Sequence, residues 1–329
     1  MPTRPLGRTG LAVSPLGLGL AALGRPGYIN LGHADDLGRD YRPEAMEARC
    51  HEVLDAAFAA GVRYFDAARS YGEAERFLAS WLARRGRKRG EVTVGSKWGY
   101  TYTAGWRTEA VKHEVKDHSP AVLRRQAEES RALLGGWLDL YQIHSATLDS
   151  GVLDDAGVLG ELAKLRGRGW KVGLSLTGPR QAETLRKALA CRVDGVRLFD
   201  AVQATWNLLE PSCGEALAEA RAAGLGVIVK EALANGRLTP RNDAPAFADK
   251  RRVLEAVARR LGCGLDALAL AAALAHGDVA LSGAATVEQV TANARALAVP
   301  WSAEVERELA ALAEPAESYW RERAGLAWN

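Results

Sequence analysis

The sequence predicts an α/β protein folded as a (β/α)8 TIM barrel, with an N-terminal β-hairpin and a C-terminal helix plus tail. Eight short apolar runs rich in β-branched residues alternate with longer amphipathic stretches, and strand followed by helix, eight times, closes naturally as a barrel. Three polar side chains also stand at the ends of three consecutive predicted strands. An open doubly wound sheet would alternate in the same way, so closure is inferred from the count and from the placement of these side chains.

Each predicted element has its own local signal. The strands are short β-branched runs bounded by loop-forming residues: Leu16–Leu20, Arg63–Phe65, Val92–Ser96, Leu138–Ile143, Val172–Leu176, Ala201–Gln203, Gly226–Val229 and Val279–Ser282. The helices are longer stretches rich in Ala, Leu and Arg: Glu44–Ala59, Glu73–Arg85, Pro120–Leu134, Ala156–Arg168, Arg180–Ala190, Cys213–Ala223, a doubled segment across Ala248–His276, and Val287–Leu297.

Three segments lie outside this alternation. Residues Arg4–Ser14, with a Thr-Gly turn, predict a small hairpin that plugs the barrel floor. The segment Arg25–Pro43 is rich in Gly, Asp and Arg and has no periodicity, so it is predicted to be a long first β→α loop on the catalytic face. After Pro300 we expect a helix to about Ala313 and then an aromatic tail, ESYWRERAGLAWN.

Composition favours a small-molecule enzyme made of one domain, residues 1–329. The 43 basic and 40 acidic residues are spread along the chain, which argues against a nucleic-acid partner. No apolar stretch approaches the roughly 18 residues of a membrane span, and MPTRPLGRTG lacks the apolar core of a signal peptide, so we expect no membrane partner and a cytoplasmic location. The widely spaced cysteines are expected to be reduced, buried thiols: Cys50, Cys191, Cys213 and Cys263. The sequence leaves the oligomeric state open.

Four titratable residues form the candidate catalytic site. Asp66, Lys97 and His144 each end a predicted strand, in FDAARSYG, VGSKWGY and LYQIHSA. These ends share one face of a parallel barrel, and Tyr71 follows Asp66 by five residues, so a loop can return it to the same point. Taken singly, each residue is more often structural. Their joint placement predicts a catalytic cluster.

Proton transfer to a carbonyl is the chemistry that this cluster fits. An alkoxide forming during hydride transfer needs a proton, and a phenol can supply it if its pKa of about 10 is lowered. We expect Lys97 to lower the pKa of Tyr71, Asp66 to hold Lys97 charged, and His144 to orient the carbonyl or relay the proton.

The chain resembles the aldo-keto reductase superfamily. The motifs RPLGRTGLAVSPLGLG, FDAARSYGEAE, GSKWGY, DLYQIHS, KVGLSL, VQATWNLL and GAATVEQVTANA follow that family's order between residue 4 and about residue 297. The resemblance implies a (β/α)8 barrel that binds NAD(P)H without a Rossmann domain and interconverts a carbonyl (aldehyde, ketone or sugar) and an alcohol. It also implies a catalytic Asp, Tyr, Lys and His, which map to Asp66, Tyr71, Lys97 and His144.

Cofactor and substrate contacts also follow from the resemblance and from position. By the resemblance, Ser175 and Gln203 would bond the nicotinamide carboxamide and Leu233–Leu238 would approach the pyrophosphate. The expected cofactor contacts are Leu20, Asp66, Ser175, Gln203, Lys230, Leu233, Gly236, Gln289 and Asn293. Trp98 and Trp106 follow the catalytic lysine, so they are assigned to the substrate pocket.

The chain departs from the family pattern at several cofactor positions. Ala67 and Leu176 replace the usual Thr and Asn, and Lys230 stands where an aromatic ring normally stacks on the nicotinamide. Gly283, Ala285 and Gln289 replace residues that often bind the 2′-phosphate of NADP. Neutral groups cannot make the charge-assisted bonds that a phosphate prefers. The choice between NAD and NADP therefore stays open, with Arg237 or Lys250 as substitute cations.

Other functional classes fit less well. GLGLAA, beginning at Gly17, matches a Rossmann fingerprint, but the glycines and proline that follow break any helix there. No Tyr has a Lys four residues later, as a short-chain dehydrogenase requires. His113 and His118 lack partner ligands, so no metal site is predicted. An NAD-dependent sugar or alcohol dehydrogenase, and a non-catalytic cofactor-binding barrel like the potassium-channel β-subunits, remain as alternatives.

Overall fold

Eight parallel strands close into a barrel in a computed structural model that describes residues 1–329. The strand order around the barrel is β12-β13-β14-β3-β4-β5-β8-β9. These strands are β3 (Leu16–Gly19), β4 (Tyr64–Asp66), β5 (Thr93–Trp98), β8 (Leu138–Ala146), β9 (Lys171–Leu176), β12 (Ala201–Thr205), β13 (Gly226–Lys230) and β14 (Val279–Ser282). The closed parallel barrel confirms the predicted fold class, and each strand overlaps its predicted run.

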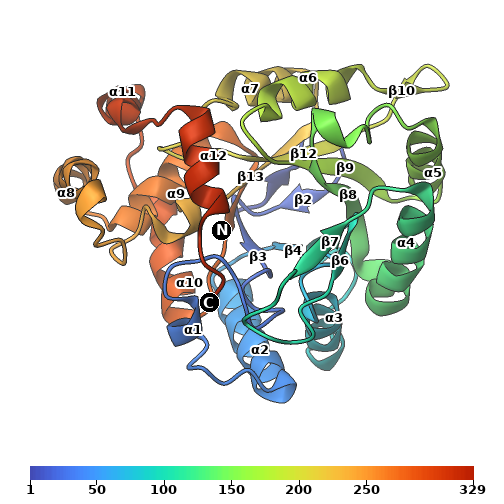
Figure 1. Cartoon of the computed structure of the whole chain (residues 1–329), viewed down its shortest axis with the longest axis horizontal. Helices are drawn as coiled ribbons and strands as arrows, with labels where there is room; N and C mark the ends of the chain where they lie inside the picture. Colours follow the sequence, from blue (N-terminus) through green and yellow to red (C-terminus); the bar gives the residue numbers. More distant parts are fainter.

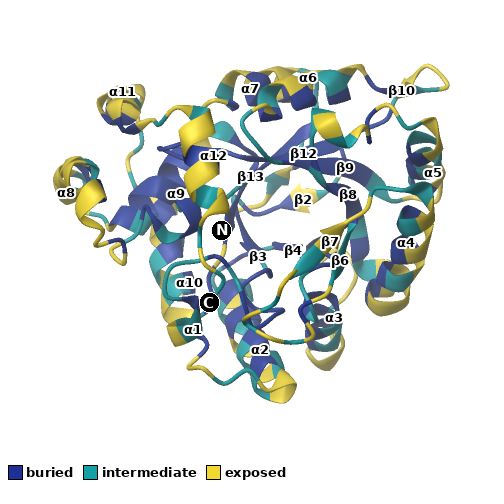
Figure 2. Cartoon of the chain, in the orientation of Figure 1, coloured by how far each residue is buried: buried dark blue, intermediate teal, exposed yellow.

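The helices surround the barrel (Figure 1). They are α1 (His33–Asp36), α2 (Pro43–Ala59), α3 (Ala74–Arg84), α4 (Pro120–Leu134), α5 (Ala156–Gly167), α6 (Gln181–Ala190), α7 (Gly214–Ala222), α8 (Ala248–Leu261), α9 (Leu265–His276), α10 (Val287–Ala294), α11 (Ala303–Leu309) and α12 (Ala316–Ala324). Their inner faces are buried and their outer faces exposed (Figure 2). Helix α9 is the exception, since most of its residues are buried, as expected of a helix apolar on all sides.

The N-terminal hairpin, β1 (Arg4–Pro5) paired with β2 (Ala12–Val13), closes one end of the barrel. Leu6 and Val13 are fully buried and pack in one apolar cluster with the barrel residues Tyr64 and Ile228. At Gly7, with φ of 50°, a Cβ would lie 2.3 Å from the backbone N of Gly226, so only glycine fits this approach. The functional site therefore lies at the opposite end of the barrel, where the strands have their carboxyl ends.

Four further features were not predicted. Helix α1 lies in the segment expected to be a loop, and a hairpin of β6 (Tyr100–Tyr102) and β7 (Glu114–Lys116) follows β5. A small hairpin of β10 (Arg192–Val193) and β11 (Val196–Arg197) lies between α6 and β12. Helix α12 occupies most of the expected tail, because its aromatic pair Tyr319 and Trp320 is buried.

No helix is both long enough and apolar enough to span a bilayer.

Candidate functional site

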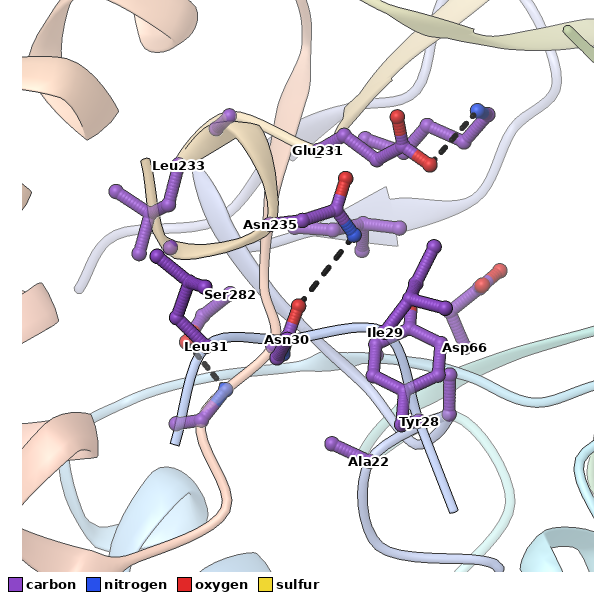
Figure 3. A pocket seen from close by; sticks show the side chains of 18 of the residues that line it. Ala22, Tyr28, Ile29, Asn30, Leu31, Asp66, Glu231, Leu233, Asn235 and Ser282 are labelled. Atoms are coloured by element: carbon purple, nitrogen blue, oxygen red, sulfur yellow. Dashed lines mark hydrogen bonds and ion pairs between the residues drawn. The ribbon is translucent and has the colours of Figure 1, made fainter. Parts of the chain in front are cut away.

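A cavity of about 440 Å³ opens at the carboxyl ends of the barrel strands. Its wall includes Asp66, Tyr71 and His144 at one end and Ser282 and Asn293 at the other. Figure 3 shows residues of the first loop, the segment after β13, and β14 facing one another across it. One cavity therefore connects the predicted catalytic cluster with the start of α10.

Of the four predicted catalytic residues, Asp66, Tyr71 and His144 line this cavity, and the buried Lys97 contacts two of them from behind its wall. Asp66 ends β4, Lys97 lies on the neighbouring β5, and His144 lies on β8. The Lys97 ammonium is buried, forms an ion pair with Asp66, and donates to the carbonyl of Ala67 at 2.9 Å and to the hydroxyl of Tyr71 at 3.4 Å. The loop after β4 thus brings Tyr71 back onto Lys97, as the spacing predicted.

Asp66 is held by neutral donors on its other oxygen. The Tyr64 hydroxyl donates to Oδ1 at 3.1 Å, and the Gln203 amide donates to the same atom at 3.0 Å. A buried carboxylate is tolerated when it is both paired and hydrogen-bonded. The carboxylate is therefore fixed in place, and with it the ammonium of Lys97.

His144 lies against Tyr71 as a neutral imidazole. Its ring centroid is 5.4 Å from that of Tyr71 in an edge-on arrangement, and its Nδ1 lies 3.4 Å from the Ser70 hydroxyl. Burial lowers the pKa of His144 well below its ordinary value, and Lys97 and Arg25 lower it further. A neutral ring can donate or accept a hydrogen bond at a substrate oxygen without adding charge.

The pKa of Tyr71 does not move in the expected direction. Burial of the phenol is the largest effect and raises its pKa above 10, and the Asp66 carboxylate raises it further, while Arg25 opposes both. Desolvation disfavours the charged phenolate, and the nearby Asp66 carboxylate, which is paired with Lys97, disfavours it as well. The expected net lowering of the Tyr71 pKa is therefore wrong, because burial of the phenol and the Asp66 carboxylate outweigh the nearby cations.

Arg25 is a site residue that the sequence did not reveal. Its guanidinium is buried beside Tyr71, with its carbon 5.2 Å from the Tyr71 ring centroid. It donates to the Ser70 carbonyl at 2.9 Å and to the Glu114 carboxylate at 2.9 Å. Glu114 lies on the unpredicted hairpin, so no strand-end pattern pointed to this pair. The only sequence signal was an arginine in a loop already expected to face the site.

The C-terminal segment also contributes to the wall of the cavity. Arg323 of α12 forms an ion pair at 2.5 Å with the buried Glu231, and Trp328 lines the cavity beside Arg25. Asn329 exchanges two backbone hydrogen bonds with Tyr28, each 3.1 Å long. Figure 1 shows this segment crossing the barrel toward the end marked C.

Most of the predicted cofactor contacts line the cavity. These are Asp66, Gln203, Lys230, Leu233, Gly236, Gln289 and Asn293. Two others do not. Leu20 is fully buried beneath the wall, and Ser175 is buried with its hydroxyl accepting the backbone N–H of Ser145 at 2.8 Å. Both belong to the layer that supports the wall.

Trp98 and Trp106 do not line the cavity, which corrects their assignment to the substrate pocket. Trp98 is fully buried and packs edge-on against His118, with ring centroids 5.6 Å apart. Trp106 packs edge-on against Phe77 and donates its indole N–H to the Tyr41 carbonyl at 2.5 Å. Both rings stabilise the loop after β5, where aromatic residues have packing partners.

Lys230 stands in the cavity wall as a partly neutralised cation. Its ammonium donates to the Thr205 hydroxyl at 2.7 Å and lies 3.7 Å from the Glu231 carboxylate. Burial lowers the pKa of Lys230 to about 8, and Glu231 partly opposes that shift. Burial also raises the pKa of Glu231, but Arg323 and Lys230 outweigh it and bring the value to about 2.

The far end of the cavity offers neutral polar groups suited to a dinucleotide. The Asn235 amide donates to Asn30 at 3.4 Å across the opening, while its own buried Oδ1 has no partner (Figure 3). The α10 N-terminus lies beside Gly283 and Ala284, and such a terminus presents free N–H groups. An unsatisfied buried oxygen and free N–H groups fit a ligand carrying both amide and phosphate.

The cations near this end are already paired. Arg237 binds Glu314 at 2.7 Å and Lys250 binds the same carboxylate at 2.5 Å, and neither lines the cavity. Arg241 does line it, but its guanidinium is held by Asp36. Across the chain, no group of three or more His, Cys, Asp or Glu side chains is arranged to hold a metal ion.

Comparison with known proteins gives the same assignment as the geometry. The model of the Aldo/keto reductase family matches residues 15–314. Aldo-keto reductase str7 of Strobilurus tenacellus is 27% identical over 249 residues, covering 74% of this chain and 65% of the relative's length. The 6-dehydroglucose reductase of Novosphingobium aromaticivorans is 28% identical over 312 residues, covering 91% of each chain.

A solved structure shares the fold. The holo form of aldo-keto reductase AKR11C1 from Bacillus halodurans has a TM-score of 0.72 at 24% identity, covering 97% of this chain and 99% of that chain. Together with the family match over most of the sequence, the closed barrel and the clustered Asp66, Tyr71, Lys97 and His144 lead to one assignment. The chain belongs to the aldo-keto reductase family, whose members are oxidoreductases acting on carbonyl and alcohol groups.

Proposed function

We propose that this protein is an NAD(P)H-dependent reductase of aldehydes, ketones or sugars, with Tyr71 as the general acid. The observation that carries the proposal is the contact of the Tyr71 hydroxyl with the buried Lys97–Asp66 pair at the wall of the cavity. The bound nicotinamide would supply the hydride. A phenol kept protonated by burial is ready to give its proton to the oxygen that becomes an alkoxide.

The neighbouring residues would position the carbonyl and stabilise the phenolate that Tyr71 becomes. A carbonyl oxygen within reach of the Tyr71 hydroxyl would also meet the neutral imidazole of His144, whose ring lies 5.4 Å from the Tyr71 ring. Lys97 donates to Tyr71 and would stabilise the phenolate as the proton leaves. Asp66 would hold Lys97 in that position.

The other end of the cavity would hold the rest of the cofactor. Asn235 and Gly236 from the segment after β13, and Gln289 and Asn293 from α10, line this end, while Gln203 presents its amide at the Asp66 end. This lining supplies polar contacts but no unpaired cation. We therefore propose that NAD(H) is used at least comparably with NADP(H).

Two alternatives differ in direction or in outcome. A sugar or alcohol dehydrogenase would use the same residues with Tyr71 as the base, and a non-catalytic barrel would bind the cofactor without turnover. The presence of all four proton-transfer residues in contact favours an enzyme. The protonated state of Tyr71 favours reduction. The relative named a 6-dehydroglucose reductase adds sugar carbonyls to the candidate substrates.

The test is a cofactor-dependent absorbance assay on the purified protein. NADH and NADPH are compared in parallel across aldehydes, ketones and sugars, with the matching alcohols and oxidised cofactors as the reverse assay. We expect turnover in the reductive direction with at least one cofactor. Tight cofactor binding without turnover of any compound would contradict the proposal and support a binding barrel.

A further inference from the structure

Arg25 and Glu114 form an ion pair in the cavity wall that the proposed proton transfer does not use. Arg25 Nη1 lies 2.9 Å from Glu114 Oε2, and their side chains are 3% and 25% exposed. Both residues line the same cavity as Tyr71. The pair joins the loop after β3 to β7, so two segments from different parts of the chain meet beside the proton donor.

The pair has polar atoms without partners. The Arg25 hydrogen bonds all come from Nη1, to Ser70 and Glu114, while its buried Nε has no partner and Nη2 makes no hydrogen bond. Glu114 uses only Oε2. A guanidinium has five N–H donors and a carboxylate has two accepting oxygens. Because a buried donor without a partner costs free energy, these atoms are suited to a ligand.

Aromatic rings hold the guanidinium in place and border the same space. The Arg25 guanidinium carbon lies 5.4, 5.2 and 4.8 Å from the ring centroids of Tyr28, Tyr71 and Trp328. Trp328 is itself stacked on His113, with centroids 3.9 Å apart and planes 7° from parallel. Tyr28 and Trp328 also line the cavity. Their apolar faces can contact the C–H groups of a ligand whose oxygens reach the ion pair.

The charges select the class of ligand. A carboxylate would be attracted by Arg25 but repelled by Glu114, and an alkyl chain would leave the free donors unmet. A hydroxyl group can accept from Arg25 and donate to Glu114 at once. We propose that Arg25 and Glu114 form a substrate subsite that binds hydroxyl groups of a polyhydroxylated aldehyde or ketone whose carbonyl lies at Tyr71. This inference rests on the proposed function and narrows its substrate class.

Matched substrates test the subsite in the wild-type protein. Glyceraldehyde and propanal differ only in two hydroxyl groups, and succinic semialdehyde carries a carboxylate in their place. Hydrogen bonds to charged groups are strong enough that we expect kcat/KM for glyceraldehyde to exceed that for each of the others by about tenfold. Equal or higher kcat/KM for propanal would overturn the proposal.

The variant Glu114→Gln tests the charge argument through a gain that misfolding cannot produce. The amide has the same shape but leaves Arg25 with an unbalanced positive charge. We expect kcat/KM for succinic semialdehyde, relative to glyceraldehyde, to rise by about tenfold. Glu109→Gln is the matched control. Glu109 is exposed in the segment that joins β6 to β7, and it does not line the cavity. An unchanged ratio in Glu114→Gln would overturn the subsite.

A binding measurement separates this inference from the proposed function. Erythritol carries hydroxyl groups but no carbonyl, and saturation-transfer NMR can follow its binding to the protein with NADH present. Binding by wild type that is lost in Glu114→Gln, with no aldehyde reduced, would leave the subsite standing and overturn the reductase. Aldehyde reduction without erythritol binding by wild type would overturn the subsite alone.

Discussion

At the scale of single residues, the chemistry depends on which groups carry protons. The buried Tyr71 has a raised pKa, and His144 has a lowered one, so the phenol is protonated and the imidazole neutral at neutral pH. Reduction needs the protonated phenol, whereas oxidation needs its phenolate. The site is therefore prepared for reduction, although Arg25 partly favours the phenolate.

The pH dependence of the two directions should differ for this reason. Reduction should not lose activity through ionisation of Tyr71 below about pH 10, its ordinary value. Oxidation should rise with pH over the same range, because the phenolate fraction increases about tenfold per unit below the pKa. Initial rates of both directions, measured between about pH 6 and about pH 10, check this.

We expect a separate inflection near pH 8 from Lys230. Lys230 lines the cavity and has a pKa lowered to about 8, so its charge is lost as the pH rises through that value. Such an inflection should disappear in Lys230→Gln. If reduction still fell between pH 7 and pH 9 in that variant, with hydride transfer shown to be rate-limiting by an isotope effect, the protonated state assigned to Tyr71 would be wrong.

At the scale of elements, the C-terminal segment completes the cavity through one buried ion pair. Arg323 on α12 binds Glu231, which follows β13 directly. The carboxylate has a pKa of about 2, below its ordinary 4.5, so its ionic stabilisation is present above pH 4.5 and is lost as the pH falls toward 2. Packing of α12 onto the barrel therefore depends on the charge of Glu231.

Arg323→Met should strongly destabilise the protein. Removing one partner leaves the Glu231 carboxylate buried without its main counter-charge, and such losses cost about 3 kcal/mol. Chemical denaturation at pH 7 measures the free energy of unfolding. The double variant Arg323→Met/Glu231→Gln should recover part of the loss. Equal stability of Arg323→Met and wild type would show that the pair does not hold α12.

The N-terminal hairpin makes a comparable prediction at the other end of the barrel. Leu6 is fully buried against the barrel floor, and truncating a buried leucine costs about 2–5 kcal/mol. Leu6→Ala should lower the free energy of unfolding by that amount while KM for the substrate changes little, because Leu6 does not line the cavity. Leu11→Ala, at a partly buried neighbour, is the control. A loss no larger than in that control would mean that the hairpin does not plug the barrel.

The sequence predicted the barrel elements because their signals are local. Each barrel strand is a short apolar run, and the strand ends show where Asp66, Lys97 and His144 lie. The missed parts depend on distant contacts. Arg323 and Glu231 are 92 residues apart, and the Asn329 side chain binds the Asn30 carbonyl across 299 residues. No periodicity encodes such pairs, so Arg25, Glu114 and Trp328 could not be assigned to the site.

At the scale of the whole molecule, cofactor choice depends on how the charges of distant segments pair. Arg237 and Lys250 are bound to Glu314, and Arg241 is bound to Asp36. Without a free cation, NADP loses charge-assisted bonds worth about 1.5–3 kcal/mol each. We expect Kd values for NADH and NADPH within about tenfold of each other, measured by tryptophan fluorescence.

The Asp36→Asn variant provides the matched comparison for cofactor choice. It frees the Arg241 guanidinium at the wall of the cavity, so it should raise the affinity for NADPH relative to NADH. In the wild type, tighter binding of NADPH by about 100-fold or more, roughly 2.7 kcal/mol, would reveal a phosphate site that the paired cations do not explain.

The central claim is that Tyr71 gives the proton that accompanies hydride transfer to a carbonyl. Single-turnover oxidation of the bound reduced cofactor by an aldehyde tests it most directly, comparing wild type, Tyr71→Phe and the control Tyr41→Phe, whose ring lies outside the cavity wall. We predict that Tyr71→Phe slows this step by at least about 100-fold and leaves cofactor Kd nearly unchanged, while Tyr41→Phe matches wild type. A near-normal rate in Tyr71→Phe would contradict the account.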